Sequence, residues 1–198
     1  MKKYVVSALV VAAGVLSAGR SSADQLVTNG GFETGDFTGW TLSGNTGFTN
    51  VVSFNTHSGN YAASFGPVGS TGMIEQTQLL DTVAGQTYDF SFWLLADGGT
   101  PNSFSASFDG TEVLSISNTN GFAYTLFDFS VVATTNQTAL SFTYRHDPAF
   151  YYLDDVSVIG TRGVVPEPAS AMLLGLGSTG MLAAYRRKRR KSAAHASA

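Results

Sequence analysis

Short stretches of the chain alternate apolar and polar residues with a period of two. Because successive side chains of a β-strand point to opposite faces, this spacing predicts antiparallel strands that bury one face. Residues 24–161 contain no sustained helical period. The apolar positions of the three clearest stretches are Tyr88, Phe90, Phe92 and Leu94; Phe104, Ala106 and Phe108; and Leu140, Phe142 and Tyr144.

Turn-forming residues separate these stretches at short intervals. Asn-Gly, Asp-Gly and Ser-Gly pairs recur along residues 24–161, and the pair Asp109-Gly110 between Phe108 and Val113 predicts a tight hairpin. We expect roughly nine or ten short strands, which is typical of a sandwich or jelly roll. The predicted fold class is therefore all-β, an antiparallel β-sandwich of the jelly-roll kind over residues 24–161.

An apolar run opens the chain. Lys2 and Lys3 precede the apolar residues 4–16, and Ser21-Ser22-Ala23 places small residues where a signal peptidase cleaves. The run is too short for an ordinary membrane-spanning helix, which needs about 20 residues. We expect residues 1–23 to be the helix of a signal peptide that signal peptidase removes before Asp24. The alternative is a buried N-terminal helix.

A second apolar run lies near the C-terminus. Residues 168–185 are eighteen residues without a charge, and the basic residues 186–191 follow directly. The run reaches the lower limit for crossing a bilayer, and the positive-inside rule keeps the basic cluster in the cytoplasm. We expect a single transmembrane helix here, outside the domain. Basic clusters also bind nucleic acids or anionic lipids, but beside an apolar run they are typical of stop-transfer.

The order of parts at this end resembles a known sorting signal. Pro166, Glu167 and Pro168 come first, then the apolar run, then the arginine-rich cluster. This order is similar to the PEP-CTERM signal of bacterial surface proteins. We assign residues 162–165 to a linker, 166–191 to the signal and 192–198 to a tail, which family members commonly lack.

The resemblance implies a route out of the cell. In that family an exosortase in the membrane recognises the motif and removes the helix, much as a GPI signal loses its apolar tail. The implied partners are signal peptidase, an exosortase-type enzyme and, before processing, the inner membrane. The implied location is the cell surface or the extracellular space, often alongside exopolysaccharide production.

Charge divides the chain in the same way. Residues 24–161 hold thirteen acidic residues and one basic residue, Arg145, whereas the two flanks are basic. The net charge of −3 is therefore an average over unlike regions. A body this acidic repels phosphate groups, so we expect no nucleic-acid partner. The absence of cysteine excludes a disulfide scaffold, a thiolate metal cluster and a cysteine nucleophile.

Three segments of the domain resemble galactose-binding-like jelly rolls, which include several families of carbohydrate-binding modules. They are residues 26–33 with Gly39-Trp40, residues 57–63, and the closing residues 151–158. Members of these families often hold a structural calcium ion between the first and last strands. By position, Glu33 and Asp155 match the acidic ligands, with backbone carbonyls near Thr28 and Ser58 as helpers.

This calcium hypothesis is chemically reasonable, because Ca²⁺ takes six to eight oxygen ligands that mix carboxylates and carbonyls. The alternative is that Glu33 and Asp155 are capping or turn residues. Strand alternation predicts that the neighbouring Asp154 and Asp155 point to opposite faces, so that one of them faces the ion.

Sugar rings stack on aromatic side chains, which makes exposed aromatic residues the candidates for ligand binding. Trp93 is the first candidate, because alternation turns it away from the apolar face of its strand. Tyr144, Tyr151 and Tyr152 are the next candidates. The alternative for Trp93 is that it packs beneath a loop. An aromatic row on one sheet face favours sugar binding, whereas a smooth serine and threonine face, as at Ser103, Ser105 and Ser107, favours a matrix role.

Catalysis has little support in the sequence. Residues 24–161 hold two histidines, His57 and His146, and no nucleophile elbow, zinc-protease motif or phosphate loop. We predict a non-enzymatic exported surface or matrix protein that binds extracellular polysaccharide weakly. The alternative is a structural or adhesive matrix component without sugar affinity, stabilised by calcium.

Overall fold

The fold is known from a computed structural model that describes residues 24–147 and 149–160. The predicted signal peptide, the motif Pro166, Glu167 and Pro168, the predicted transmembrane helix and the basic cluster lie outside the described residues. No helix that is long and apolar enough to cross a membrane occurs within the described ranges.

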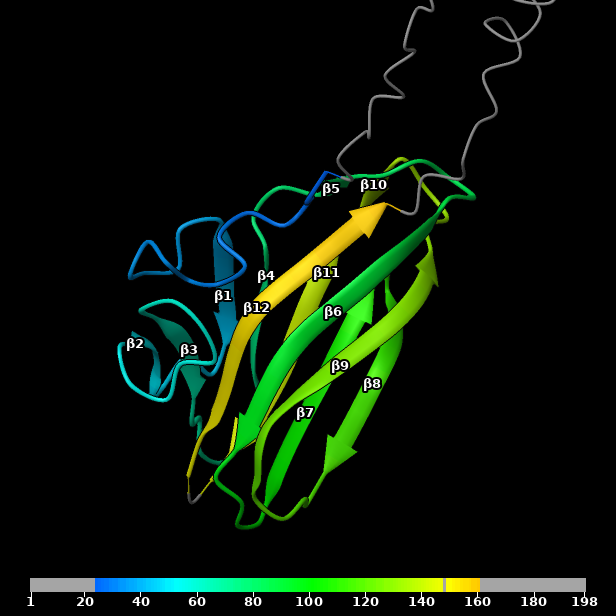
Figure 1. The fold of residues 1–198 in the computed structure, drawn as a ribbon. Coiled ribbons are helices and arrows are strands. Elements are labelled where there is room, and N and C mark those ends of the chain that lie inside the picture. Colours follow the sequence, from blue (N-terminus) through cyan, green and yellow to red (C-terminus); the bar gives the residue numbers. More distant parts are fainter. Residues whose placement is uncertain (1–23, 148, 161–198) are drawn as a thin grey trace, which may run out of the picture. The chain divides into compact units, whose positions relative to one another are not determined.

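Twelve strands make up the described part, which contains no helix (Figure 1). Two of them, β5 and β10, have only two residues each, so the ten longer strands match the expected number. The strands are β1 (Trp40–Gly44), β2 (Thr49–Val52), β3 (Ala62–Phe65), β4 (Gly72–Gln76), β5 (Leu80–Asp81), β6 (Thr87–Ala96), β7 (Asn102–Phe108), β8 (Thr111–Ser117), β9 (Phe122–Val132), β10 (Gln137–Thr138), β11 (Leu140–His146) and β12 (Tyr151–Gly160).

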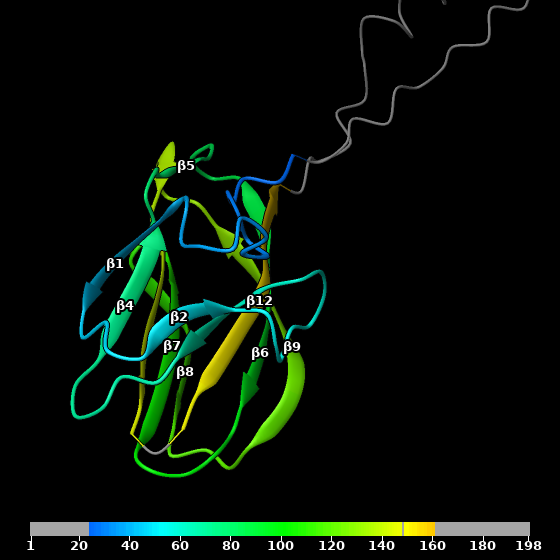
Figure 2. The same ribbon diagram turned by 90° about the vertical axis from the view of Figure 1, so that its left-hand side faces the viewer.

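The strands form two five-stranded antiparallel sheets and a small pair. One sheet has the order β2-β3-β12-β6-β9 and is called the β6 sheet below; the other has the order β1-β4-β11-β7-β8 and is called the β7 sheet. Strands β5 and β10 pair separately. A view turned by 90° shows the two layers, with β1 and β4 on one side and β6 and β9 on the other (Figure 2). The all-β sandwich expected from the sequence is confirmed.

The period of two along the sequence sets which side chains fill the space between the layers. In β6, Tyr88, Phe90, Phe92 and Leu94 are buried, while the residues between them are exposed or half-buried. Strands β7 and β11 alternate in the same way. Their aromatic rings meet across the sandwich, and the Phe92 and Phe142 ring centroids are 5.1 Å apart. The core is therefore an aromatic layer between two sheets.

The hairpin predicted at Asp109-Gly110 is also confirmed. Strands β7 and β8 pair directly on either side of it, with Phe108 opposite Thr111. Asp109 and Gly110 have φ angles of 53° and 74°. Positive φ at both central residues is the geometry of the two-residue turn that best fits the twist of a hairpin.

The beginning and the end of the domain lie side by side. Gln25 forms a bridge with Ile159, and the Leu26 amide donates to the carbonyl of Val158 at 3.0 Å. Further along, the Val156 amide donates to the carbonyl of Gly30, also at 3.0 Å. The opening segment therefore packs along β12, which brings Glu33 close to the aspartates of the closing strand.

Candidate functional site

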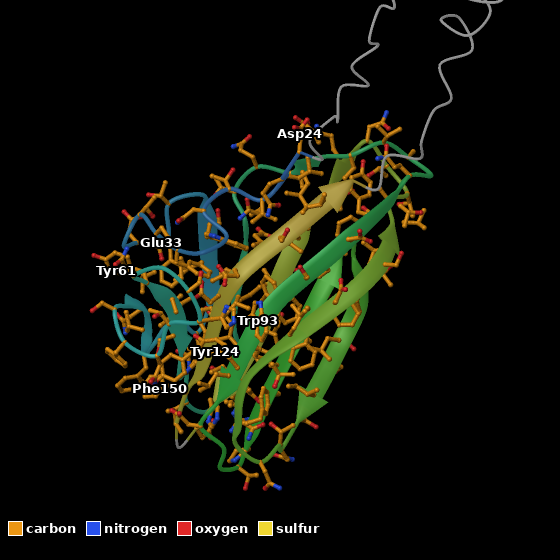
Figure 3. All side chains as sticks on the ribbon, in the orientation of Figure 1. Asp24, Glu33, Tyr61, Trp93, Tyr124 and Phe150 are labelled. Carbon is orange, nitrogen blue, oxygen red and sulfur yellow. The ribbon has the colours of Figure 1, made fainter. Side chains whose placement is uncertain are left out.

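A loop of nine residues, 53–61, connects β2 to β3 and lies across the outer face of the β6 sheet. It is called the covering loop. The hydroxyl of Tyr124 on β9 donates to the carbonyl of Asn55 in this loop, and His57 stacks on Trp93 of β6. Figure 3 labels Trp93 and Tyr124 on these two strands. The loop thus reaches from β2 at one edge of the sheet to β6 and to β9 at the other edge.

A β-bulge in β12 supplies the carboxylates that hold the covering loop. The register between β12 and β6 shifts between Asp154 and Ser157, and Asp155 has a φ of 49°. A bulge interrupts the alternation of side chains. Asp154 and Asp155 consequently both reach the covering loop, and the prediction that they point to opposite faces is wrong.

Asp154 is fully buried beneath the loop. Its Oδ2 accepts hydrogen bonds from the amides of His57 at 2.9 Å and Ser58 at 3.1 Å, and its Oδ1 accepts one from the Asp155 amide. Burial raises the pKa of the Asp154 carboxyl, since a low-dielectric environment disfavours the charged form. These amide donors oppose that effect. Asp154 acts as an acceptor that fixes the loop backbone.

Asp155 binds side chains of the same loop. Its Oδ2 lies 2.6 Å from His57 Nδ1, and its Oδ1 accepts a hydrogen bond of 2.8 Å from the Ser58 hydroxyl. The side chains of His57 and Asp155 are both partly exposed. Because Ser58 and His57 both bond to the aspartate, and not to each other, the three residues do not form a nucleophile–base–acid relay.

Glu33 holds the far end of the covering loop. Its carboxylate accepts hydrogen bonds from the amides of Asn60 at 2.8 Å and Tyr61 at 3.0 Å. The Tyr61 and Asn60 amides lower the pKa of Glu33, because they stabilise its ionised form. A Cβ on Gly59 would lie 2.2 Å from Glu33 Oε1, so a larger residue there would displace the carboxylate from the loop amides.

The calcium hypothesis depends on what these carboxylates face. They converge around Gly31, whose Cβ position would lie 3.6 Å from Asp155 Oδ1 and 3.7 Å from Glu33 Cγ. Each carboxylate accepts N–H or O–H donors from the covering loop, and N–H groups direct positive charge into the site. Among the described residues, no group of three or more acidic or histidine side chains is placed to hold a metal. Calcium binding by Glu33 and Asp155 stays a prediction.

Trp93 lies half-buried on the outer face of the β6 sheet. The His57 ring stacks on the indole with centroids 3.8 Å apart, and the Tyr124 ring contacts His57 edge-on at 5.3 Å. Trp93 is therefore packed beneath a loop, as the alternative interpretation of the sequence had it, although it remains part of an exposed aromatic group.

Phe54 is a further aromatic residue of the covering loop. Its side chain is 59% exposed, and its ring centroid lies 6.3 Å from that of Tyr152. Phe150, labelled in Figure 3, lies 6.2 Å from Tyr152 on its other side. We call Phe54, His57, Trp93 and Tyr124 the aromatic surface. It faces away from the core on the β6 sheet.

The three tyrosines chosen from the sequence are not part of this surface. Tyr144 and Tyr151 have no exposed area, and Tyr152 is covered by Phe54 and Phe150. Tyr144 stacks on Phe65 at 3.9 Å between the two sheets, and the hydroxyl of Tyr151 donates to Asn102 Oδ1. Since a sugar needs an accessible ring face, the prediction that Tyr144 and Tyr151 bind ligand is wrong.

The outer face of the β7 sheet has a different character. Small hydroxyl side chains stand opposite one another on neighbouring strands, so that Ser105 pairs with both Thr143 and Ser115. The smooth face expected at Ser103, Ser105 and Ser107 is present here. The two interpretations that the sequence left open thus correspond to the two faces of one sandwich.

Phe54 and Tyr124 are site residues that the sequence analysis missed. Tyr124 sits in a strand whose tyrosine, leucine and aspartate positions alternate outward, a signal that was available. Phe54 lies in a loop without periodicity. Its position depends on contacts with Tyr152, which is far away in the sequence.

Comparison with known proteins agrees with this geometry. A family model described as a carbohydrate binding domain matches residues 24–151, and a model of the PEP-CTERM protein-sorting motif matches residues 164–190. A search of curated proteins found no significant match. The sorting motif marks an exported protein that an exosortase processes.

Solved structures with the same fold include three binding domains. TmCBM61, solved with β-1,4-galactotriose, is 23% identical, with 69% of this chain and 98% of that chain covered and a TM-score of 0.53. The CBM22-1 xylan-binding domain of Paenibacillus barcinonensis Xyn10C is 14% identical, with 72% of this chain and 98% of that chain covered and a TM-score of 0.51. The K3 adhesin domain of Porphyromonas gingivalis Lys-gingipain is 18% identical, with 70% of this chain and 99% of that chain covered and a TM-score of 0.52. The TM-scores show a shared fold. The family match over residues 24–151 shows that the chain belongs to the carbohydrate binding domain family.

Proposed function

We propose that this exported protein binds an extracellular polysaccharide through the aromatic surface of its β6 sheet. One observation carries the proposal. In a domain of the carbohydrate-binding family, Trp93 and Tyr124 lie on one outer face with His57 in contact with both, and Phe54 of the same covering loop is largely exposed. The apolar faces of sugar rings pack on aromatic rings, while nearby polar groups fix their orientation.

The surroundings of the aromatic surface supply such polar groups. The Ser91 and Ser157 side chains stand opposite each other beside Trp93 on the same face, and Ser58 lies in the covering loop. A sugar that stacks on Phe54 or on the exposed edge of Trp93 has hydroxyl and carboxylate groups within reach. This arrangement supports binding rather than bond cleavage, because Asp154 and Asp155 beside Trp93 are engaged in holding the loop.

The sorting signal supports a binding function outside the cell. We propose that signal peptidase removes residues 1–23 and that the C-terminal helix anchors the protein in the inner membrane until an exosortase-type enzyme cuts near Pro168. Mass spectrometry of the surface fraction should then find an N-terminus at Asp24 and a C-terminus near Pro168. Recovery of a chain that keeps residues 186–191 would instead indicate a retained anchor.

Binding is tested by affinity electrophoresis and calorimetry of the full-length chain against a panel of polysaccharides. Phe54→Ala should weaken the affinity for the polysaccharide about tenfold, which corresponds to ~1.4 kcal/mol of binding free energy. Leu79→Ala is the matched control, since Leu79 is an exposed apolar residue outside the covering loop and the aromatic surface. No binding to any polysaccharide, or equal binding by wild type and by both Phe54→Ala and Trp93→Ala, would reject the proposal.

A structural matrix role is the second candidate. The hydroxyl-rich outer face of the β7 sheet favours it, because small side chains let a flat sheet pack closely against another surface. In that case the polysaccharide panel gives no binding, while variants such as Ser105→Lys disturb the protein's association with the extracellular matrix.

A further inference from the structure

The aromatic surface continues into an acidic part of the same sheet face. On β6, the outward residues after Trp93 toward the start of the strand are Ser91 and Asp89. On β9, Leu126 stands opposite Trp93 and Asp128 opposite Ser91. Side chains that oppose each other in an antiparallel pair share a face. Asp89 and Asp128 therefore extend the outer face on which Trp93 lies.

The register also fixes how near these residues are. Asp128 is a diagonal neighbour of both Trp93 and Asp89 across the two strands. Diagonal neighbours have Cα atoms about 7–8 Å apart, within reach of long or aromatic side chains. A chain of sugars that leaves the aromatic surface along β6 consequently passes Asp128 and then Asp89.

Positive side chains are missing around this path. Arg145 is the only lysine or arginine among residues 24–147 and 149–160. It lies on β11 of the other sheet, where Nε and Nη2 each bond to Asp147 at 2.7 Å. His57 is engaged by Asp155. Within the described residues, Asp89 and Asp128 thus lack a lysine or arginine partner.

Two exposed like charges on neighbouring strands oppose folding slightly, so they do not serve the stability of the sheet. They do act on a ligand. Uronic acid or sulfate groups are repelled from this face. Neutral sugars offer it only hydroxyl donors, whereas protonated amino groups form hydrogen bonds in which donor and acceptor carry opposite charges. Leu126, an exposed apolar residue opposite Trp93, lies on the same face and offers a further apolar contact to a sugar ring.

We propose that the polysaccharide recognised by the aromatic surface is an amino glycan with free, protonated amino groups, and that Asp89 and Asp128 select it. This inference rests on the proposed function, since it names the class of sugar that the aromatic surface binds. The aromatic residues stack on the sugar rings, and the two carboxylates accept hydrogen bonds from ammonium groups further along the chain.

The test compares three probes on the full-length protein by calorimetry at low ionic strength: β-1,4-linked glucosamine oligomers, the same oligomers fully N-acetylated, and polygalacturonate. We expect the glucosamine oligomers to bind about three- to tenfold more tightly than the acetylated ones, as two exposed charge pairs allow. Added salt should remove this difference. Polygalacturonate should not bind.

Variants separate this face from the general negative charge of the domain. Asp89→Asn with Asp128→Asn should abolish the preference for free amino groups over acetylated ones. Asp81→Asn with Glu112→Gln removes the same charge from exposed sites elsewhere and should keep the preference. An equal loss in both double variants would assign the preference to net charge and overturn the inference.

The remaining outcomes are also decisive. Equal affinity for both kinds of oligomer would overturn the inference but support the proposed function. Tighter binding of polygalacturonate would overturn the charge argument itself. If none of the three probes binds, the inference fails. If no polysaccharide of the wider panel binds either, the proposed function fails with it.

Discussion

The imidazole of His57 lies flat on the indole of Trp93, with ring centroids 3.8 Å apart and planes 15° from parallel. The other contacts of His57 explain why it stays there. Its Nδ1 is 2.6 Å from Asp155, and the edge of the Tyr124 ring packs against it. These contacts hold the covering loop against Trp93. The position of His57 therefore determines how much of the Trp93 ring is accessible to solvent and ligand.

Removing the His57 ring should expose Trp93. The chain has two tryptophans, and Trp40 is buried in the core. We expect His57→Ala to shift fluorescence emission to longer wavelength and to increase quenching by acrylamide, because only Trp93 gains access to solvent. Val83→Ala, at an exposed site away from the loop, should change neither. Unchanged quenching in His57→Ala would show that the covering loop shields Trp93 without the histidine.

The covering loop should also depend on Asp154. In Asp154→Ala the amides of His57 and Ser58 lose their acceptor in a buried place, which costs about 1–3 kcal/mol of folding free energy. Urea unfolding measures the loss, and hydrogen exchange should quicken at these two amides. Asp155→Asn keeps an acceptor for the partly exposed Ser58 side chain and should cost less. A larger loss of stability in Asp155→Asn would show that Asp155, and not Asp154, is the main attachment of the loop.

The fold was predictable because alternation is a local signal with a physical cause. Period-two spacing identified the buried faces of β6, β7 and β11, and Asp109-Gly110 identified a turn. The same signal argued against one proposed site residue. Tyr144 follows Leu140 and Phe142 on the apolar side of its strand, and it is buried with them.

The site was less predictable because it is built from long-range contacts and a break in periodicity. His57 and Asp155 are 98 residues apart in the chain. The bulge that turns both Asp154 and Asp155 to the covering loop needs a positive φ at Asp155, which no spacing of apolar residues indicates. Loop residues such as Phe54 have no period at all.

The opening segment offers a steric test of its packing on β12. A Cβ on Gly30 would lie 2.0 Å from the carbonyl oxygen of Val156, a backbone atom that cannot move aside. We expect Gly30→Ala to cost about 3 kcal/mol by thermal or urea unfolding. Gly110→Ala is the control, since it meets nothing within 4 Å and has only an unfavourable φ of 74°. It should cost about 1–2 kcal/mol. Equal costs would mean that Gly30 has room to relax.

Calcium is tested by melting with and without a chelator. The hydrogen bonds from the Asn60 and Tyr61 amides to Glu33 favour a loop attached without metal. We therefore expect EDTA to leave the Tm unchanged. Glu33→Gln should lower the Tm to the same extent with and without calcium, because it weakens these acceptors. A Tm that falls with EDTA in the wild type, but not in Glu33→Gln, would establish the ion predicted from the sequence.

His146 gives a pH dependence with a definite sign. Its ring is fully buried, packs edge-on against Tyr151, and has no hydrogen-bond partner at either nitrogen among the residues that the structure describes. Burial lowers the pKa of His146 from 6.5, whereas the nearby Asp97 and Asp147 act in the opposite direction. The unfolded chain therefore binds the proton more readily than the folded one. The stability that this neutral ring allows is complete above pH 6.5 and is lost as the pH falls below it.

We expect the free energy of unfolding of the wild type to fall between pH 7 and pH 5, by at most about 1.4 kcal/mol per pH unit from this one group. In His146→Phe the ring stays apolar at every pH, so this part of the slope should vanish, and stability at pH 7 should not decrease. His57→Gln is the control, because it removes the other histidine of the domain and should keep the slope that His146 causes. If the slope disappears in His57→Gln and persists in His146→Phe, the acid sensitivity belongs to the covering loop and not to the core.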